Sequence, residues 1–89
     1  MNKEYYSQNL SCRVRKIGGM RVLYGEGSCF DLNEIAHDIW IALDDRKSLS
    51  EVADAIEKEY DADRDTIERD AALLIQQLAK ANMLIVEHE

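Results

Sequence analysis

The sequence has 89 residues, of which 46% are hydrophobic and 33% are charged. This length allows one domain, since a second hydrophobic core would need about 50 further residues, and the composition is that of a globular chain rather than a disordered one. No apolar run is long enough to span a membrane, and the polar first residues lack the layout of a signal peptide, so we expect a soluble, cytoplasmic protein. We expect a single domain over residues 1–89, with its core at about 12–85 and an N-terminal tail at 1–11.

The net charge of −7 is distributed unevenly along the chain. Residues 1–25 hold five basic residues and one acidic residue, so residues 26–89 carry a net charge of −11. A domain with this balance repels a phosphate backbone, which makes nucleic acid a poor default partner.

The first third of the chain predicts three short strands separated by glycine-containing turns. The expected strands are 12–17, 20–24 and 28–32, with turns at Gly18-Gly19 and at Gly25-Glu26-Gly27. Side chains alternate along a strand, so Phe30 and Leu32 should share one face of the third strand and Cys29 and Asp31 the other. The pattern indicates a three-stranded antiparallel sheet.

The remainder of the chain predicts three amphipathic helices. Asn33 is a suitable N-cap for the first, and the Ser48-x-x-Glu51 pattern is a capping box for the second, which we expect to end near Tyr60. Asp63 can cap the third helix, and Asn82 suits the left-handed position that ends it. Residues 83–86 are apolar enough to dock as a short terminal strand. The order predicts an α+β fold of the winged helix-turn-helix type, with a three-stranded antiparallel sheet followed by three helices.

No combination of residues predicts catalysis, a bound metal or a cofactor. His37 and His88 lack a neighbouring nucleophile, and Cys12 and Cys29 lack the spacing of a zinc site. An acidic run occurs where the third helix begins, but it has neither the central glycine nor the final glutamate of a calcium-binding loop. The members of this run are Asp61, Asp63, Asp65, Glu68 and Asp70.

A winged-helix fold raises the alternative of a DNA-binding regulator, in which the third helix would enter the major groove. The start of that helix offers four acidic and two basic residues, so repulsion should prevail. A basic first hairpin could still contact a phosphate backbone through Arg13, Arg15, Lys16 and Arg21.

Two features predict a surface that binds a peptide. Leu73 lies about 130° from the centre of the apolar stripe of the third helix, on an outer face that also carries Arg69, Asp70 and Gln77. The third strand could lie at the edge of its sheet, where unpaired backbone groups can accept an extended peptide as an added strand. Two such edges could also pair with each other, so we expect a monomer or a weak homodimer.

The sequence resembles the PqqD family over about residues 12–85. The resemblance rests on Cys29–Trp40 with its Leu32-Asn33, Ala36 and Ile39-Trp40, and on several later positions. Asn82 stands where the family commonly has glycine, but asparagine can adopt the same backbone conformation. The later positions are Ser48–Ala53, Tyr60, Ile67–Asp70, Leu74, Leu78 and Asn82–Leu84.

The resemblance implies a non-catalytic, winged-helix-like domain that binds the leader segment of a ribosomally synthesised precursor peptide. It implies delivery of that leader to modifying enzymes such as a leader peptidase, a cyclase or a radical SAM enzyme, as in lasso peptide or PQQ biosynthesis. The leader would pair antiparallel with the third strand and pack between that strand and the third helix. Phe30 could equally be a core residue, and Asp70 a helix cap or part of a salt bridge. The implied peptide-binding residues are Ser28, Cys29, Phe30, Asp31, Arg69, Asp70, Leu73 and Gln77.

Overall fold

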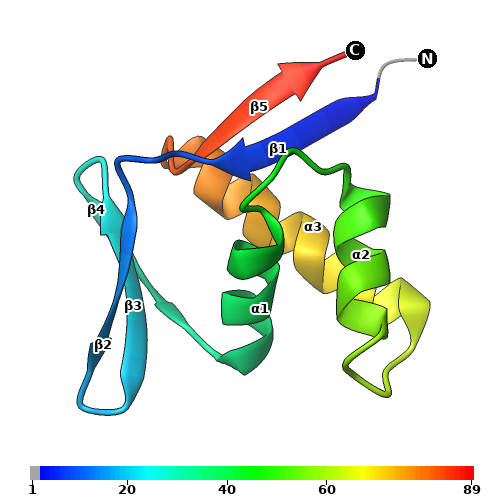
Figure 1. Cartoon of the computed structure of the whole chain (residues 1–89), viewed down its shortest axis with the longest axis horizontal. Coiled ribbons are helices and arrows are strands. Elements are labelled where there is room, and N and C mark those ends of the chain that lie inside the picture. Colours follow the sequence, from blue (N-terminus) through cyan, green and yellow to red (C-terminus); the bar gives the residue numbers. More distant parts are fainter. Residues whose placement is uncertain (1–2) are drawn as a thin grey trace.

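The computed structural model describes residues 3–89 and shows a mixed α+β fold with two small antiparallel sheets and three helices (Figure 1). The strands β2, β3 and β4 form one sheet, and β1 pairs with β5 in the other. No helix among residues 3–89 is both long and apolar enough to cross a bilayer. The elements in chain order are β1 (Glu4–Gln8), β2 (Arg13–Ile17), β3 (Met20–Gly25), β4 (Ser28–Leu32), α1 (Glu34–Ala42), α2 (Leu49–Glu57), α3 (Arg64–Lys80) and β5 (Leu84–His88).

The three-stranded sheet has the strands and the facing that the sequence predicts. Both hairpins turn through two residues with positive φ, namely Gly18-Gly19 and Glu26-Gly27, as in turns that match the twist of paired strands. Leu32 is buried and Phe30 is half-buried against the core, whereas Cys29 and Asp31 are exposed. The expectation that Phe30 and Leu32 share the inner face is therefore confirmed.

The sequence predicts a short terminal strand at 83–86, and β5 confirms it, but the tail expected at residues 1–11 misses the strand β1 that pairs with it. Instead β1 pairs with β5 over five residues, and Tyr6 also exchanges backbone hydrogen bonds with Lys47, at 2.8 and 2.9 Å. Most of β1 is polar and only half-buried, and the strand that completes it lies about 80 residues further along the chain. A pairing of such long range leaves little local pattern in the sequence, so the strand count of three was too low.

The helix starts follow the predicted caps with one exception. The Asn33 side chain accepts a hydrogen bond from the Ala36 backbone at 2.8 Å, and Ser48 and Glu51 form both bonds of the capping box. Asp63 is the N-cap residue of α3, but its side chain makes no capping bond. Asn82 has the expected left-handed φ of 61°, while α2 ends at Glu57, one turn before the expected position.

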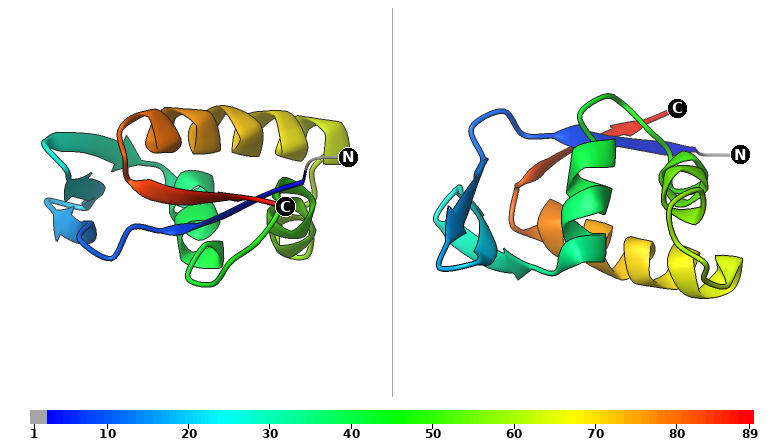
Figure 2. Two further views of the ribbon diagram at one scale, coloured as in Figure 1. Left: turned by 90° about the horizontal axis from the view of Figure 1, so that it is seen from above. Right: turned by 60° about the horizontal axis from the view of Figure 1, so that its bottom comes forward.

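The core lies between the helices and the inner faces of both sheets. Views from two further directions show α3 running along one side of the molecule, with the β2–β3–β4 sheet at one end (Figure 2). Leu23 of the sheet, Val52 of α2, Leu78 of α3 and Met83 before β5 are fully buried, so one core joins all the layers. The sheet edge formed by β4 is thereby held beside α3.

Gly25 allows the sheet to pack closely against the chain segment that precedes β2. A Cβ atom built on Gly25 would lie 2.7 Å from Sγ and 3.0 Å from Cα of the buried Cys12. We therefore expect Gly25→Ala to lower the free energy of unfolding by about 1–3 kcal/mol, measured by urea denaturation. Gly27→Ala is the control, because its Cβ would meet nothing within 4 Å and only its φ of 77° would be strained. Equal losses in the two variants would contradict the role of the Cys12 contact.

A half-buried hydrogen bond joins α1 to the segment that follows α2. The Tyr60 hydroxyl donates to Asp38 at 2.5 Å, and this bond to a carboxylate raises the pKa of Tyr60 from 10.0 to about 12. Because the folded-state pKa is the higher one, the stabilisation is complete below about pH 10 and is lost as the pH rises through about 12.

Absorbance titration of tyrosinate should thus show one of the four tyrosines ionising near pH 12 in the folded protein. In Tyr60→Phe that late phase should be missing. If Tyr60→Phe retains it, or if the wild type shows no tyrosine that ionises near pH 12, the hydrogen bond does not hold in solution.

Candidate functional site

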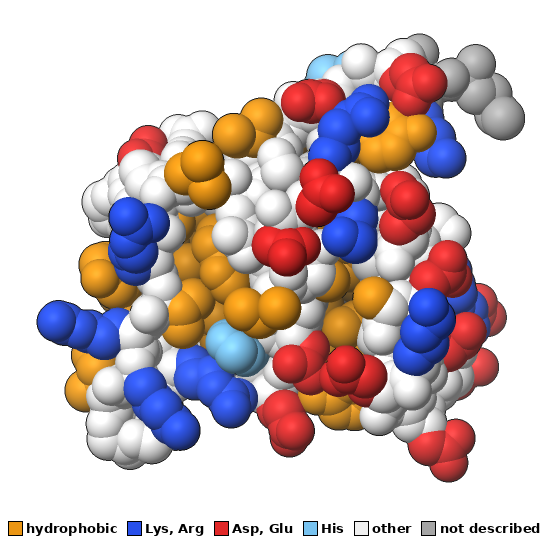
Figure 3. Space-filling view, in the orientation of Figure 1, with side chains coloured by type: hydrophobic (Ala, Val, Ile, Leu, Met, Phe, Trp, Pro, Cys, Tyr) orange, Lys and Arg blue, Asp and Glu red, His pale blue; other side chains and the backbone are white. Residues whose placement is uncertain are grey.

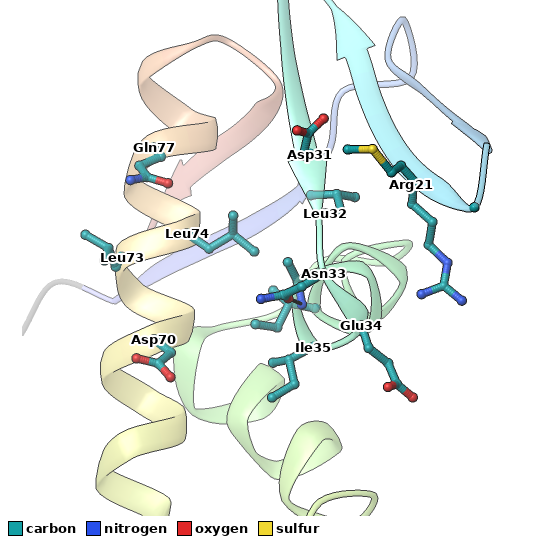
Figure 4. Close-up of a pocket in the computed structure, with 14 residues that line it drawn as sticks. Arg21, Asp31, Leu32, Asn33, Glu34, Ile35, Asp70, Leu73, Leu74 and Gln77 are labelled. Carbon is teal, nitrogen blue, oxygen red and sulfur yellow. Dashed lines mark hydrogen bonds between the residues drawn. The ribbon is translucent and has the colours of Figure 1, made fainter. Parts of the chain in front are cut away.

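A groove with a volume of about 670 Å³ lies between the β4 edge and α3 (Figure 4). The β2–β3 turn closes it on one side, and the start of α1 forms part of its floor. A second cavity of about 590 Å³ lies between the β1–β5 sheet and α3, with Leu49 of α2 in its lining. The lining residues are Gly19, Met20, Arg21, Asp31, Leu32, Asn33, Glu34, Ile35, Ala36, Ile39, Asp70, Leu73, Leu74 and Gln77.

The groove has an apolar centre. Leu74 extends from α3 across the space toward Leu32 and Ile35, while Leu73 sits further out on the helix (Figure 4). Leu73 is 56% exposed and Ile35 is 37% exposed, although both are large hydrophobic side chains. Exposed apolar groups gathered in a concave surface are typical of a site that a partner covers.

Of the eight residues that the sequence indicates for peptide binding, four line the groove. These are Asp31 from β4 and Asp70, Leu73 and Gln77 from α3. Phe30 instead packs against the core, which supports the core alternative for its side chain, and Asp70 has neither a capping bond nor an ion pair among residues 3–89. Ser28, Cys29 and Arg69 lie outside the lining.

Sequence reasoning missed several groove residues. Ile35 and Leu74 belong to apolar helical stripes, which predict burial but do not reveal that one end of each stripe faces a cavity. Met20 and Arg21 reach the groove only because the first hairpin folds beside β4, at a register of Arg21 opposite Leu32. The available sequence signal was a large apolar residue, Met20, directly after the Gly18-Gly19 turn; the structure leaves its side chain 52% exposed.

The free edge of β4 offers backbone groups at defined positions. In the described chain β4 pairs with β3 alone, and the two-residue turn makes Gly25 and Ser28 a hydrogen-bonded pair. Bonded and non-bonded pairs alternate along an antiparallel ladder, so Cys29 and Asp31 are in non-bonded pairs with β3. Their N–H and C=O groups therefore point away from β3, toward the groove side, and are available to another strand.

Charged side chains surround the apolar centre. Asp31, Glu34 and Asp70 contribute three carboxylates, against the single guanidinium of Arg21, and none of the four has a side-chain hydrogen bond or an ion pair among residues 3–89. Asn33 also lines the groove, but its side-chain oxygen is occupied by the α1 cap. The groove is thus open to a ligand with its own polar groups.

The cysteines and histidines that the sequence analysis considers lie outside the groove lining. Within residues 3–89 no three His, Cys, Asp or Glu side chains gather in a way that could hold a metal ion. Both cysteines are free, and burial raises the pKa of the Cys12 thiol. His88 lies in β5, with its ring Nδ1 3.9 Å from a carboxylate oxygen of Glu4 across the sheet.

The start of α3 is poorly suited to DNA. Arg64 donates to Asp54 at 2.6 Å and lies 3.5 Å from Glu57 and 3.8 Å from Glu68. One of the two basic residues there is thus engaged within the protein, which leaves the helix start with a surplus of carboxylates. Acidic side chains cover the helical side of the molecule, while Lys and Arg gather over the β2–β3 hairpin (Figure 3).

Comparison with known proteins shows the family. The sequence model of the family described as "Coenzyme PQQ synthesis protein D (PqqD)" matches residues 20–84, so the chain belongs to the PqqD family. No curated protein matches the sequence.

Two solved structures have the same fold. TbiB1, in a structure with the TbiA(beta) leader peptide, is 31% identical with a TM-score of 0.71, over 88% of this chain and 93% of that one. The PqqD truncation of Methylobacterium extorquens PqqCD is 26% identical with a TM-score of 0.74, over 91% of this chain and 88% of that one. The latter is described as a stand-alone recognition element for ribosomally synthesised and post-translationally modified peptides.

Proposed function

We propose that this protein is a recognition module for the leader segment of a ribosomally synthesised precursor peptide. The observation that carries the proposal is the free β4 edge beside an apolar groove, in a chain 31% identical to a protein solved with a leader peptide. An added strand gains main-chain hydrogen bonds from the edge, and pockets beside it select side chains.

In this proposal the leader lies antiparallel to β4. The outward N–H and C=O groups of Cys29 and Asp31 bind its backbone, with Ser28 and Phe30 completing the strand. Its apolar side chains pack on Leu73 and Leu74, and Asp70 and Gln77 offer polar contacts along α3. Arg69, exposed on α3 outside the groove lining, would meet only a leader that extends beyond the groove.

The domain acts without chemistry of its own, as a winged-helix-like adaptor over the whole of residues 1–89. It delivers the leader to a modifying enzyme such as a leader peptidase, a cyclase or a radical SAM enzyme. Because the precursor is made on ribosomes, this work belongs to the cytoplasm.

Leu73→Asp tests the groove. Aspartate at this position removes the apolar contact with the leader and places a second carboxylate in the groove beside Asp70. We therefore expect the dissociation constant of the leader to rise at least tenfold, which corresponds to about 1.4 kcal/mol. The measurement is calorimetric titration with the synthetic leader of the precursor encoded beside the gene. Ile41→Asp is the matched control, since Ile41 is a 51% exposed helical residue outside the groove.

The wild type and Ile41→Asp should bind equally, and the melting temperatures of both variants should stay close to that of the wild type. Absence of saturable binding by the wild type would remove the proposed function. Equal binding by Leu73→Asp and the wild type would place the leader elsewhere on the surface.

A further inference from the structure

The outer face of the three-stranded sheet is apolar along its centre, and no element among residues 3–89 covers it. Side chains alternate along β3, so the residues on either side of the buried Leu23 point away from the core. These are Met20, Val22 and Tyr24, with Met20 52% and Tyr24 41% exposed. Ile17, opposite Met20 on β2, is 56% exposed and extends this row.

One basic and one acidic side chain lie on either side of this apolar row, both level with Val22. Arg15 of β2 and Asp31 of β4 are both register partners of Val22, so they lie on the same face, one strand to each side of it. Neither has a side-chain hydrogen bond or an ion pair in the part of the chain that the structure describes. Arg13, further along β2, differs because its guanidinium donates to the Leu10 carbonyl at 2.8 Å.

We propose that two copies of this chain pair face to face through this surface, around a two-fold axis parallel to β3. Such a rotation keeps the strand direction and exchanges the two sides of the sheet, so β2 of one copy lies over β4 of the other. Arg15 then faces Asp31 of the second copy, and the reciprocal pair forms on the other side of the axis. Val22 packs on its own counterpart in the centre, as in aligned sheet packing.

Charge complementarity favours a second copy of this chain, in this orientation, over other partners for the outer face of the sheet. A two-fold axis across the strands would stack β2 on β2 and set Arg15 against Arg15, which is repulsive. An anionic membrane or an acidic protein would use Arg15 but would be repelled by Asp31. A second copy in the first orientation satisfies both charges and covers the apolar row.

The small area of this sheet face limits the affinity of the proposed dimer. Three strands about 4.8 Å apart and five residues long cover roughly 14 by 17 Å, which is well below the ~800 Å² per partner of a standard stable interface. The dimer is therefore weak and concentration-dependent. The outer edge of β4 stays uncovered in it, and pairing does not depend on the proposed leader binding. Met20 and Asp31 lie both on this face and in the groove lining, so a leader that contacts their side chains would compete with the pair.

Sedimentation velocity on the full chain, from micromolar concentrations to about 1 mM, tests the proposal through charge exchange. Arg15→Asp leaves only carboxylates at the two positions, and Asp31→Arg leaves only guanidinium groups, so each variant alone should associate at least tenfold more weakly than the wild type. An equimolar mixture should regain association, since every Asp then faces an Arg. Lys58→Asp is the control for net charge, because it makes the same change at the exposed residue that follows α2, and it should dimerise like the wild type.

A wild type that stays monomeric up to about 1 mM would overturn the proposal. So would a mixture of the two variants that stays monomeric while their circular dichroism spectra show folded protein. A dimer that is insensitive to Arg15→Asp and dissociates when a leader peptide is added would show pairing through the β4 edges instead, and would equally refute the face-to-face arrangement.

Discussion

The proposed peptide binding depends on the unpaired backbone edge of one five-residue strand, β4. β4 is bonded to β3 on one side only, and α3 runs beside its other side, so the strand is open to pairing but only for a chain that fits the groove. Proteins usually block a free edge with charges, bulges or covering elements, because it invites aggregation. Here Asp31 and the nearby Glu34 and Asp70 place carboxylates around the edge, and they restrict which chains can approach without closing it.

Most of the small hydrophobic core serves to pack the three-stranded sheet, and with it the β4 edge, against the helices. Gly25 lets β3 pack on Cys12, while Leu23 and Leu32 anchor the sheet to the helices. The β1–β5 sheet runs along one side of the helices and holds both ends of the described chain there (Figure 1). Much of an 89-residue chain is thus used to support the sheet edge and the groove beside it.

Local signals in the sequence predicted much of this fold. The caps at Asn33 and Ser48, the left-handed Asn82 and the alternation of β4 are short-range features, and all are present. The β1–β5 pair was missed because its register joins Glu4 to His88, and the groove residues Met20 and Ile35 because their exposure depends on how distant elements meet. Leu73 was identified correctly as outward-facing, since helical geometry alone determines it.

Amide hydrogen exchange measured by NMR, with and without the leader peptide, tests most directly whether a strand is added to β4. The register places the N–H groups of Cys29 and Asp31 at the free edge and that of Phe30 in the bond to β3. The account predicts that Cys29 and Asp31 exchange fast in the free protein and become strongly protected when the leader binds, while Phe30 is protected in both states. Saturable binding that leaves Cys29 and Asp31 exchanging at their original rates would contradict it.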